Sequence, residues 1–79
     1  MKAIVNVFLK AGVLDSQGKA VHHALNSLQF GNVEDVRVGK QIILKLNETD
    51  KEKAMSDVTK MCEDLLANTV IEDYTIELV

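Results

Sequence analysis

The 79-residue sequence predicts one α+β domain, residues 1–79, in which two helices lie on one face of a four-stranded antiparallel sheet. Apolar residues alternate with a period of two in four segments and recur with a helical period in two others. These segments follow one another in the order β-α-β-β-α-β. That order is typical of the ferredoxin-like sandwich.

The first strand is expected at residues 3–10, AIVNVFLK, which are rich in β-branched side chains. Alternation places Val5, Val7 and Leu9 on one face of this strand and Ile4 and Phe8 on the other.

A helix is expected at residues 16–29, because its apolar positions follow the i, i+3, i+4, i+7 spacing. Asp15 precedes it as an N-cap, and Gly31 follows it as a left-handed end. The apolar stripe consists of Val21, Ala24, Leu25 and Leu28.

Two further strands are expected at residues 33–38, VEDVRV, and 41–46, QIILKL. Gly39 and Lys40 between them suit a type II′ hairpin, which takes glycine at its first central position.

A second helix is expected at residues 51–68. Thr49 with Glu52 has the spacing of a capping box, Asp50 is a competing cap, and Asn68 suits a left-handed end. Its broad apolar face contains Ala54, Met55, Val58, Met61, Cys62, Leu65 and Leu66. Residues 70–78 close the sheet, with Tyr74, Ile76 and Leu78 on one side.

If both helices cover the Val5 face, the opposite face presents Ile4, Phe8 and Ile43 without a helix above them. Grouped apolar residues on an open sheet face indicate an interface, here between copies of the chain. The alternative is that they are scattered apolar residues of the kind common on protein surfaces.

Composition excludes several classes of function. Twelve acidic against nine basic residues leave a net charge of −3, which disfavours nucleic-acid binding. Apolar runs are far shorter than the roughly 20 residues of a membrane helix, and no signal peptide is evident. Cys62 is the only cysteine, so a reducing, cytoplasmic location is expected.

The stretch GVLDSQGKA, residues 12–20, comes close to a phosphate-binding loop but fails on two counts. Five residues separate Gly12 from Gly18, and Ala20 lacks the hydroxyl that binds magnesium. The carboxylate of Asp15 would also repel a phosphate. The stretch is therefore interpreted as a helix entry. An acylphosphatase-like site is disfavoured as well, since residues 10–20 contain no arginine.

Other reactive residues predict no site. His22 and His23 are adjacent, so a helix points them about 100° apart and away from a shared metal. Cys62 lies on the apolar helix face and fits a core residue better than a nucleophile. We expect no catalytic residue, metal ligand or cofactor on this chain.

One polar cluster stands out, at Arg37, Gly39 and Lys40. It would suit a carboxylate or phosphate of a partner. Ordinary solubility at a hairpin tip explains the same residues without a partner.

Three segments resemble the PurS family, the small subunits of phosphoribosylformylglycinamidine synthase. LKAGVLDSQGKAV (9–21) is similar to the family's LK-x-GVLDPQG-x-AV, and VEDVRVGK (33–40) to its central hairpin. MCEDLLANTVIEDYTIE (61–77) is similar to MC-x-x-LLANPVIEDY-x-IE. Ser16 and Thr69 stand where the family usually has proline.

The resemblance implies a non-catalytic assembly role in purine biosynthesis. A large ligase subunit (PurL type) uses ATP with magnesium, a glutaminase subunit (PurQ type) releases ammonia, and the small subunit, as a homodimer or tetramer, bridges them. The expected partner contacts are Asp15, Gln17, Gly18, Arg37, Gly39 and Lys40. The alternative is a small dimeric metabolite-sensing module on the same fold.

Overall fold

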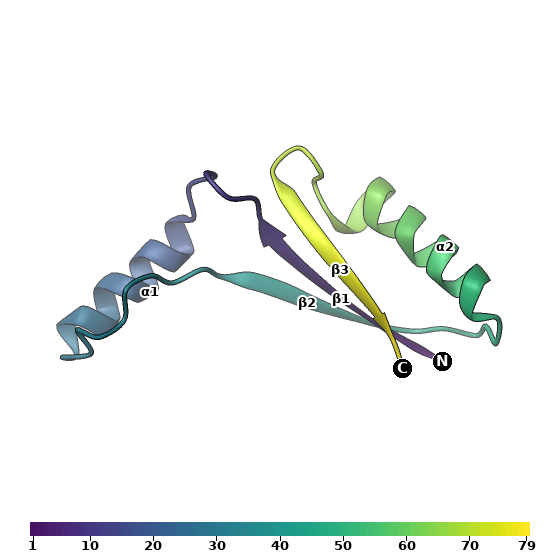
Figure 1. Ribbon diagram of the computed structural model, residues 1–79, viewed down its shortest axis with the longest axis horizontal. Coiled ribbons are helices and arrows are strands. Elements are labelled where there is room, and N and C mark those ends of the chain that lie inside the picture. Colours follow the sequence, from purple (N-terminus) through teal and green to yellow (C-terminus); the bar gives the residue numbers. More distant parts are fainter.

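The computed structural model describes all residues 1–79, arranged as three strands and two helices (Figure 1). In chain order the elements are β1 (Lys2–Leu9), α1 (Ser16–Ser27), β2 (Gly39–Lys45), α2 (Lys51–Met61) and β3 (Glu72–Leu78). A π-helical segment, η1 (Cys62–Leu66), extends α2 by five residues.

The sheet is antiparallel with the order β2-β1-β3, so the predicted four-stranded sheet is wrong. Val5 in the central strand lies opposite Ile42 of β2 and Ile76 of β3. The missing strand is residues 33–38, which run into β2 without turning back on it. Gly39 pairs with Phe8 as the first residue of β2, so the predicted hairpin at Gly39-Lys40 does not form.

The hairpin does not form because polar groups of Arg37 and Val38 make hydrogen bonds to residues 9–15. The Val38 amide donates to Asp15 Oδ2 at 2.8 Å. The Arg37 guanidinium donates to the carbonyl oxygens of Leu9, Lys10 and Val13 at 3.2–3.3 Å. These bonds hold residues 33–38 beside the start of α1, away from the outer edge of β2.

The core lies between α2 and one face of the sheet. β1 contributes its alternate residues, which are buried because β1 is central and α2 and η1 pack on that side. The buried cluster consists of Ala3, Val5, Val7, Val58, Cys62 and Ala67, with Tyr74, Ile76 and Leu78 of β3 packed against it. The predicted shared face of Tyr74, Ile76 and Leu78 is confirmed.

The expectation that both helices cover this face is wrong for α1. α1 makes no substantial contact with a strand or with α2, and it projects from the end of the sheet (Figure 1). It packs along residues 33–38 instead, where His22 Nε2 lies 2.8 Å from the Val33 carbonyl oxygen. We call residues 10–38, which comprise α1 and the segments on either side of it, the arm.

The first helix begins as predicted after Asp15, whereas the predicted Thr49–Glu52 capping box does not form and the competing cap Asp50 is used. Both helices end differently from the prediction. Asp15 and Asp50 are the N-caps, each accepting from backbone amides of the first turn. The left-handed residue after α1 is Gln29, with φ 76°, and not Gly31. Asn68 has no positive φ and so is not a left-handed cap. Its side chain accepts from the Val70 amide, in the turn that leads into β3.

The sheet face turned away from α2, which we call the open face, carries Ile4, Phe8 and Ile43. Phe8 and Ile43 are exposed and Ile4 is half-buried. A polar row crosses the strands between them, because Gln41 donates to Asn6 at 3.0 Å and Asn6 donates to Thr75 at 3.4 Å. The apolar residues on this face are therefore divided into two groups.

Candidate docking site at the base of the arm

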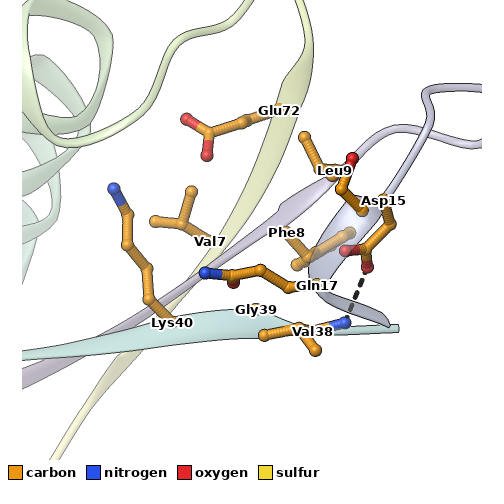
Figure 2. A pocket seen from close by; sticks show the side chains of 10 residues that line it. Val7, Phe8, Leu9, Asp15, Gln17, Val38, Gly39, Lys40 and Glu72 are labelled. Carbon is orange, nitrogen blue, oxygen red and sulfur yellow. Dashed lines mark hydrogen bonds between the residues drawn. The ribbon is translucent and has the colours of Figure 1, made fainter. Parts of the chain in front are cut away.

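The structure brings most of the predicted partner contacts together where the arm joins the sheet. Asp15, Gln17, Gly39 and Lys40 line one hollow of about 280 Å³, together with Glu72 (Figure 2). A second hollow of about 300 Å³ is lined by Asp15 and Arg37, among others. Residues far apart in the chain therefore meet at one place, with Asp15 between the two hollows.

Asp15 is the centre of this junction and is only 5% exposed. Its Oδ1 accepts from the Gly18 amide at 2.8 Å, and its Oδ2 accepts from the Val38 amide at 2.8 Å. These two bonds, that to Val38 first, hold the pKa of the carboxyl group below its ordinary value, and the Arg37 charge adds to the effect. Asp15 is a structural anchor, so it offers a partner little free surface.

Gly18 is a glycine because α1 and residues 33–38 approach closely there. A Cβ atom at Gly18 would overlap the Val36 carbonyl oxygen and lie 2.7 Å from Asp15 Oδ2. Gly18 is buried, so its part in the site is to let the arm close around Asp15.

Arg37 has a structural part that the sequence did not indicate. Its guanidinium donates to three carbonyl oxygens of residues 9–13, and its Nε lies 4.0 Å from Asp15 Oδ2. Much of the side chain is nevertheless exposed. The three hydrogen bonds fix the guanidinium, so a partner would meet it already oriented.

Gln17 and Lys40 differ from these anchors, because neither side chain makes a hydrogen bond or ion pair within the chain. Figure 2 shows Lys40 and Gln17 beside the hollow and the Glu72 carboxylate across from them. An ammonium group, an amide and a carboxylate around one hollow suit the polar side chains of a protein partner.

Glu72 is the site residue that the sequence analysis missed. It pairs with Leu9 in the sheet register, at the same end of the sheet where Phe8 pairs with Gly39. The antiparallel order of the strands alone would have indicated this position. The start of β3 has to lie beside the end of β1.

The other reactive residues lie elsewhere. Cys62 is buried in the core, and burial raises the pKa of its thiol. His22 bonds to the arm backbone.

No group of three or more His, Cys, Asp or Glu side chains is arranged to hold a metal ion. Neither helix has the length and apolar character that a membrane span requires.

Comparisons with known proteins agree on one family. The family model described as "PurS: Phosphoribosylformylglycinamidine (FGAM) synthase" matches residues 2–79. The PurS subunit of phosphoribosylformylglycinamidine synthase from Bacillus subtilis (strain 168) is 51% identical over 77 residues, which are 98% of this chain and 90% of that protein.

Solved structures give the same result. The crystal structure of PurS from Methanocaldococcus jannaschii matches with a TM-score of 0.87 and 45% identity, covering 96% of this chain and 92% of that one. A chain in the structure of PurLQS from Thermotoga maritima matches with a TM-score of 0.89 and 33% identity, covering 99% and 95%. Sequence and fold agree over nearly the whole length, and the chain belongs to the PurS family of FGAM synthase.

Proposed function

We propose that this chain is the assembly subunit of FGAM synthase, which docks the ATP-dependent ligase subunit (PurL) and the glutaminase subunit (PurQ) and supports ammonia transfer between them. One observation carries the proposal. A chain in the PurLQS structure from Thermotoga maritima matches 99% of this chain, arm included, with a TM-score of 0.89. The shape used in that complex is therefore present here.

The physical need for such a subunit follows from ammonia. Ammonia in open water is protonated or lost, so two active sites that exchange it have to be docked with water excluded between them. A domain without catalytic groups meets that need by supplying docking surface. ATP and magnesium belong to the ligase subunit in this proposal, and the complex works in the cytoplasm.

The metabolite-sensing alternative is not favoured. The curated relatives that match are FGAM synthase subunits over nearly their full length. The hollow at the base of the arm is open and shared between structural anchors and free polar groups, which suits a protein surface better than an enclosed metabolite.

Reconstitution tests the proposal. Purified ligase and glutaminase subunits are assayed for FGAM formation with and without this chain, with either glutamine or ammonia as the nitrogen source. We expect glutamine-dependent turnover to require the chain and ammonia-dependent turnover to persist without it. Glutamine-dependent turnover at full rate in its absence would contradict the proposal.

The docking site has its own test in the same assay. The double substitution Gln17→Ala and Lys40→Ala removes two side chains that the fold does not use, and we expect about tenfold weaker binding to the partner subunits. Lys51→Ala is the matched control, because Lys51 begins α2 at the end of the sheet opposite the arm (Figure 1). Equal binding by both variants would remove the hollow from the interface.

A further inference from the structure

The sequence places Leu65 on the apolar face of the second helix, but the structure exposes it. Leu65 follows Val58 by seven residues, which is almost two turns of a regular α-helix. A regular helix would therefore point the two side chains in nearly the same direction. Val58 is fully buried, whereas Leu65 is 82% exposed. The helix must change its geometry between these two residues.

The change is the π-helical segment η1. The Ala67 amide donates to the Cys62 carbonyl oxygen at 3.0 Å, so this turn is wider than an α-helical turn. A wider turn rotates successive residues by a smaller angle, which moves Leu65 away from the core while Leu66 and Ala67 still pack there. π-turns are rare and are frequently found at functional sites. The local effect of this one is to present a leucine to solvent.

Two further apolar side chains are exposed in residues 67–71, which we call the η1–β3 turn. Val70 is 82% exposed and Ile71 is 39% exposed. Asn68 shapes the turn, since its side chain accepts from the Val70 amide at 3.2 Å and its carbonyl oxygen accepts from the Ile71 amide at 3.0 Å. Exposed apolar side chains therefore follow one another from the end of η1 to the start of β3. Such a grouping indicates an interaction surface.

This apolar surface adjoins the hollow at the base of the arm. The Asn68 amide donates to Glu72 Oε1 at 2.7 Å, and Glu72 lines the hollow. The Lys10 amide donates to the Ile71 carbonyl oxygen at 2.9 Å, which ties the turn to the first residue of the arm. Figure 1 shows the turn and the start of the arm at the same end of the sheet. A partner seated in the hollow would therefore reach the η1–β3 turn as well.

The charges around these residues are mainly acidic. From Met61 to Asp73 the chain has four acidic residues and no basic one. Asp73 forms an ion pair with Lys10 at 3.9 Å, and the other three form none. A hollow of about 400 Å³ beside Leu65 has the same bias, since the charged residues around it are Asp57, Lys60 and Asp64. An apolar surface in acidic surroundings suits a partner recess that is apolar inside and bordered by lysine or arginine.

We propose that Leu65 and Val70, which we call the docking pair, insert into such a recess on a partner subunit of FGAM synthase, and that the π-turn of η1 presents Leu65 for this contact. The inference rests on the assembly function proposed above. It adds the apolar centre that the hollow by itself lacks, because stable interfaces have an apolar core inside a polar rim. Gln17, Lys40 and Glu72 then belong to the rim.

Assembly of the chain with purified ligase and glutaminase subunits, with glutamine and nucleotide present, tests the docking pair. We expect the double variant Leu65→Ser and Val70→Ser to assemble at least about tenfold more weakly than the wild type. The double variant Met55→Ser and Val79→Ser is the matched control. Both of its side chains are exposed, Met55 in the first half of α2 and Val79 at the other end of β3. Circular dichroism and denaturant unfolding check that both variants keep the wild-type fold.

A charge reversal tests the chemistry of the recess. Asp64→Lys should weaken assembly at least about tenfold, and the loss should shrink as the salt concentration rises, because salt screens the repulsion between like charges. Glu77→Lys is the matched control, since it changes the net charge equally but lies exposed on the open face, opposite Ile4. Equal effects of the two reversals would show that only overall charge matters and would overturn the basic border of the recess.

Unchanged assembly of the Leu65→Ser and Val70→Ser variant would overturn the proposal. The assembly function would still stand in that case if glutamine-dependent turnover required the chain, so the two failures are distinguishable. Sedimentation of the variants without partner subunits examines the other occupant. Weaker self-association of the serine variant would assign the docking pair to a contact with a second copy of the chain, and it would overturn the proposal as well.

Discussion

Asp15 Oδ2 accepts a hydrogen bond of 2.8 Å from the amide of Val38, 23 residues along the chain. This bond joins the start of α1 to the residue before β2, and the Asp15 Oδ1 bond to Gly18 closes the same junction. The carboxylate that caps the helix therefore also sets the course of the arm.

Acid should loosen the arm through Asp15. Its pKa is lower in the folded chain than in the unfolded chain, so the stabilisation is present above the unfolded pKa and is lost as pH falls through the folded one. We expect the Val38 and Gly18 amide resonances to titrate together in NMR spectra recorded from about pH 5 down to about pH 2. Asp15→Asn is the control and should abolish the titration. Amides that do not respond would show that the carboxylate does not hold the arm.

Gly18→Ala should destabilise the chain by about 1–3 kcal/mol, because the added methyl group overlaps the Val36 carbonyl oxygen and crowds Asp15. Denaturant unfolding measures the loss. Gly31→Ala is the matched control, since a Cβ there meets nothing within 4 Å and φ is not positive. We expect that control to lie within about 0.5 kcal/mol of the wild type. Equal stability of the two variants would mean that α1 and residues 33–38 are not in close contact.

Cys62 should be inert toward thiol reagents in the folded chain. It is fully buried in the core, and its raised pKa keeps the thiol protonated at neutral pH. We expect its reaction with an aromatic disulfide reagent to be at least about a hundredfold slower than in the chain unfolded by guanidinium, because reaction requires opening of the core. Similar rates in the two states would contradict the packing of α2 on the sheet.

The phenol of Tyr74 should ionise at a higher pH than an ordinary tyrosine. Its hydroxyl donates to Glu63 Oε2 at 2.7 Å, and this bond raises the pKa of Tyr74 to about 12. The folded chain then holds the proton longer than the unfolded chain, so this contribution to stability falls as pH rises from about 10 to about 12. Tyr74 is the only tyrosine, and phenolate absorbance follows it without interference.

Glu63→Gln is the control for that measurement. It removes the charge that opposes ionisation of Tyr74, so the midpoint should move toward the ordinary tyrosine value of about 10. A wild-type midpoint already at the ordinary value would show that the Tyr74–Glu63 bond does not persist in solution.

The sequence predicted the strands at either end of the chain and both helices, because each has a strong local period. It failed at residues 33–38, whose alternation is that of a strand although they pair with nothing. Alternation shows which side chains share a face, but a strand also needs a neighbouring strand with which to pair. For residues 33–38, the bonds at Asp15 and Arg37 decide which part of the chain lies beside them. No local sequence pattern reveals those bonds. The same bonds placed α1 off the sheet.

For the candidate site, the sequence identified the residues but not which of them hold the fold and which are free to contact a partner. Asp15, Gly18 and Arg37 anchor the arm, whereas Gln17 and Lys40 remain free for a partner. Residue type does not separate these two groups. The distinction depends on which polar groups already have a partner within the chain.

By itself, the sequence determined the family, the helix start at Asp15, and the apolar faces of β1 and β3. These features depend on residues close together in the chain. On the second helix the sequence left the cap open between Thr49 and Asp50, and of the apolar face it predicted, Met55, Met61 and Leu65 are exposed. Only the tertiary structure decided that residues 33–38 lead into β2 without a hairpin and that α1 stands apart from the sheet. A hairpin and an open arm satisfy the same local preferences, and the choice between them depends on hydrogen bonds between residues that are distant in sequence.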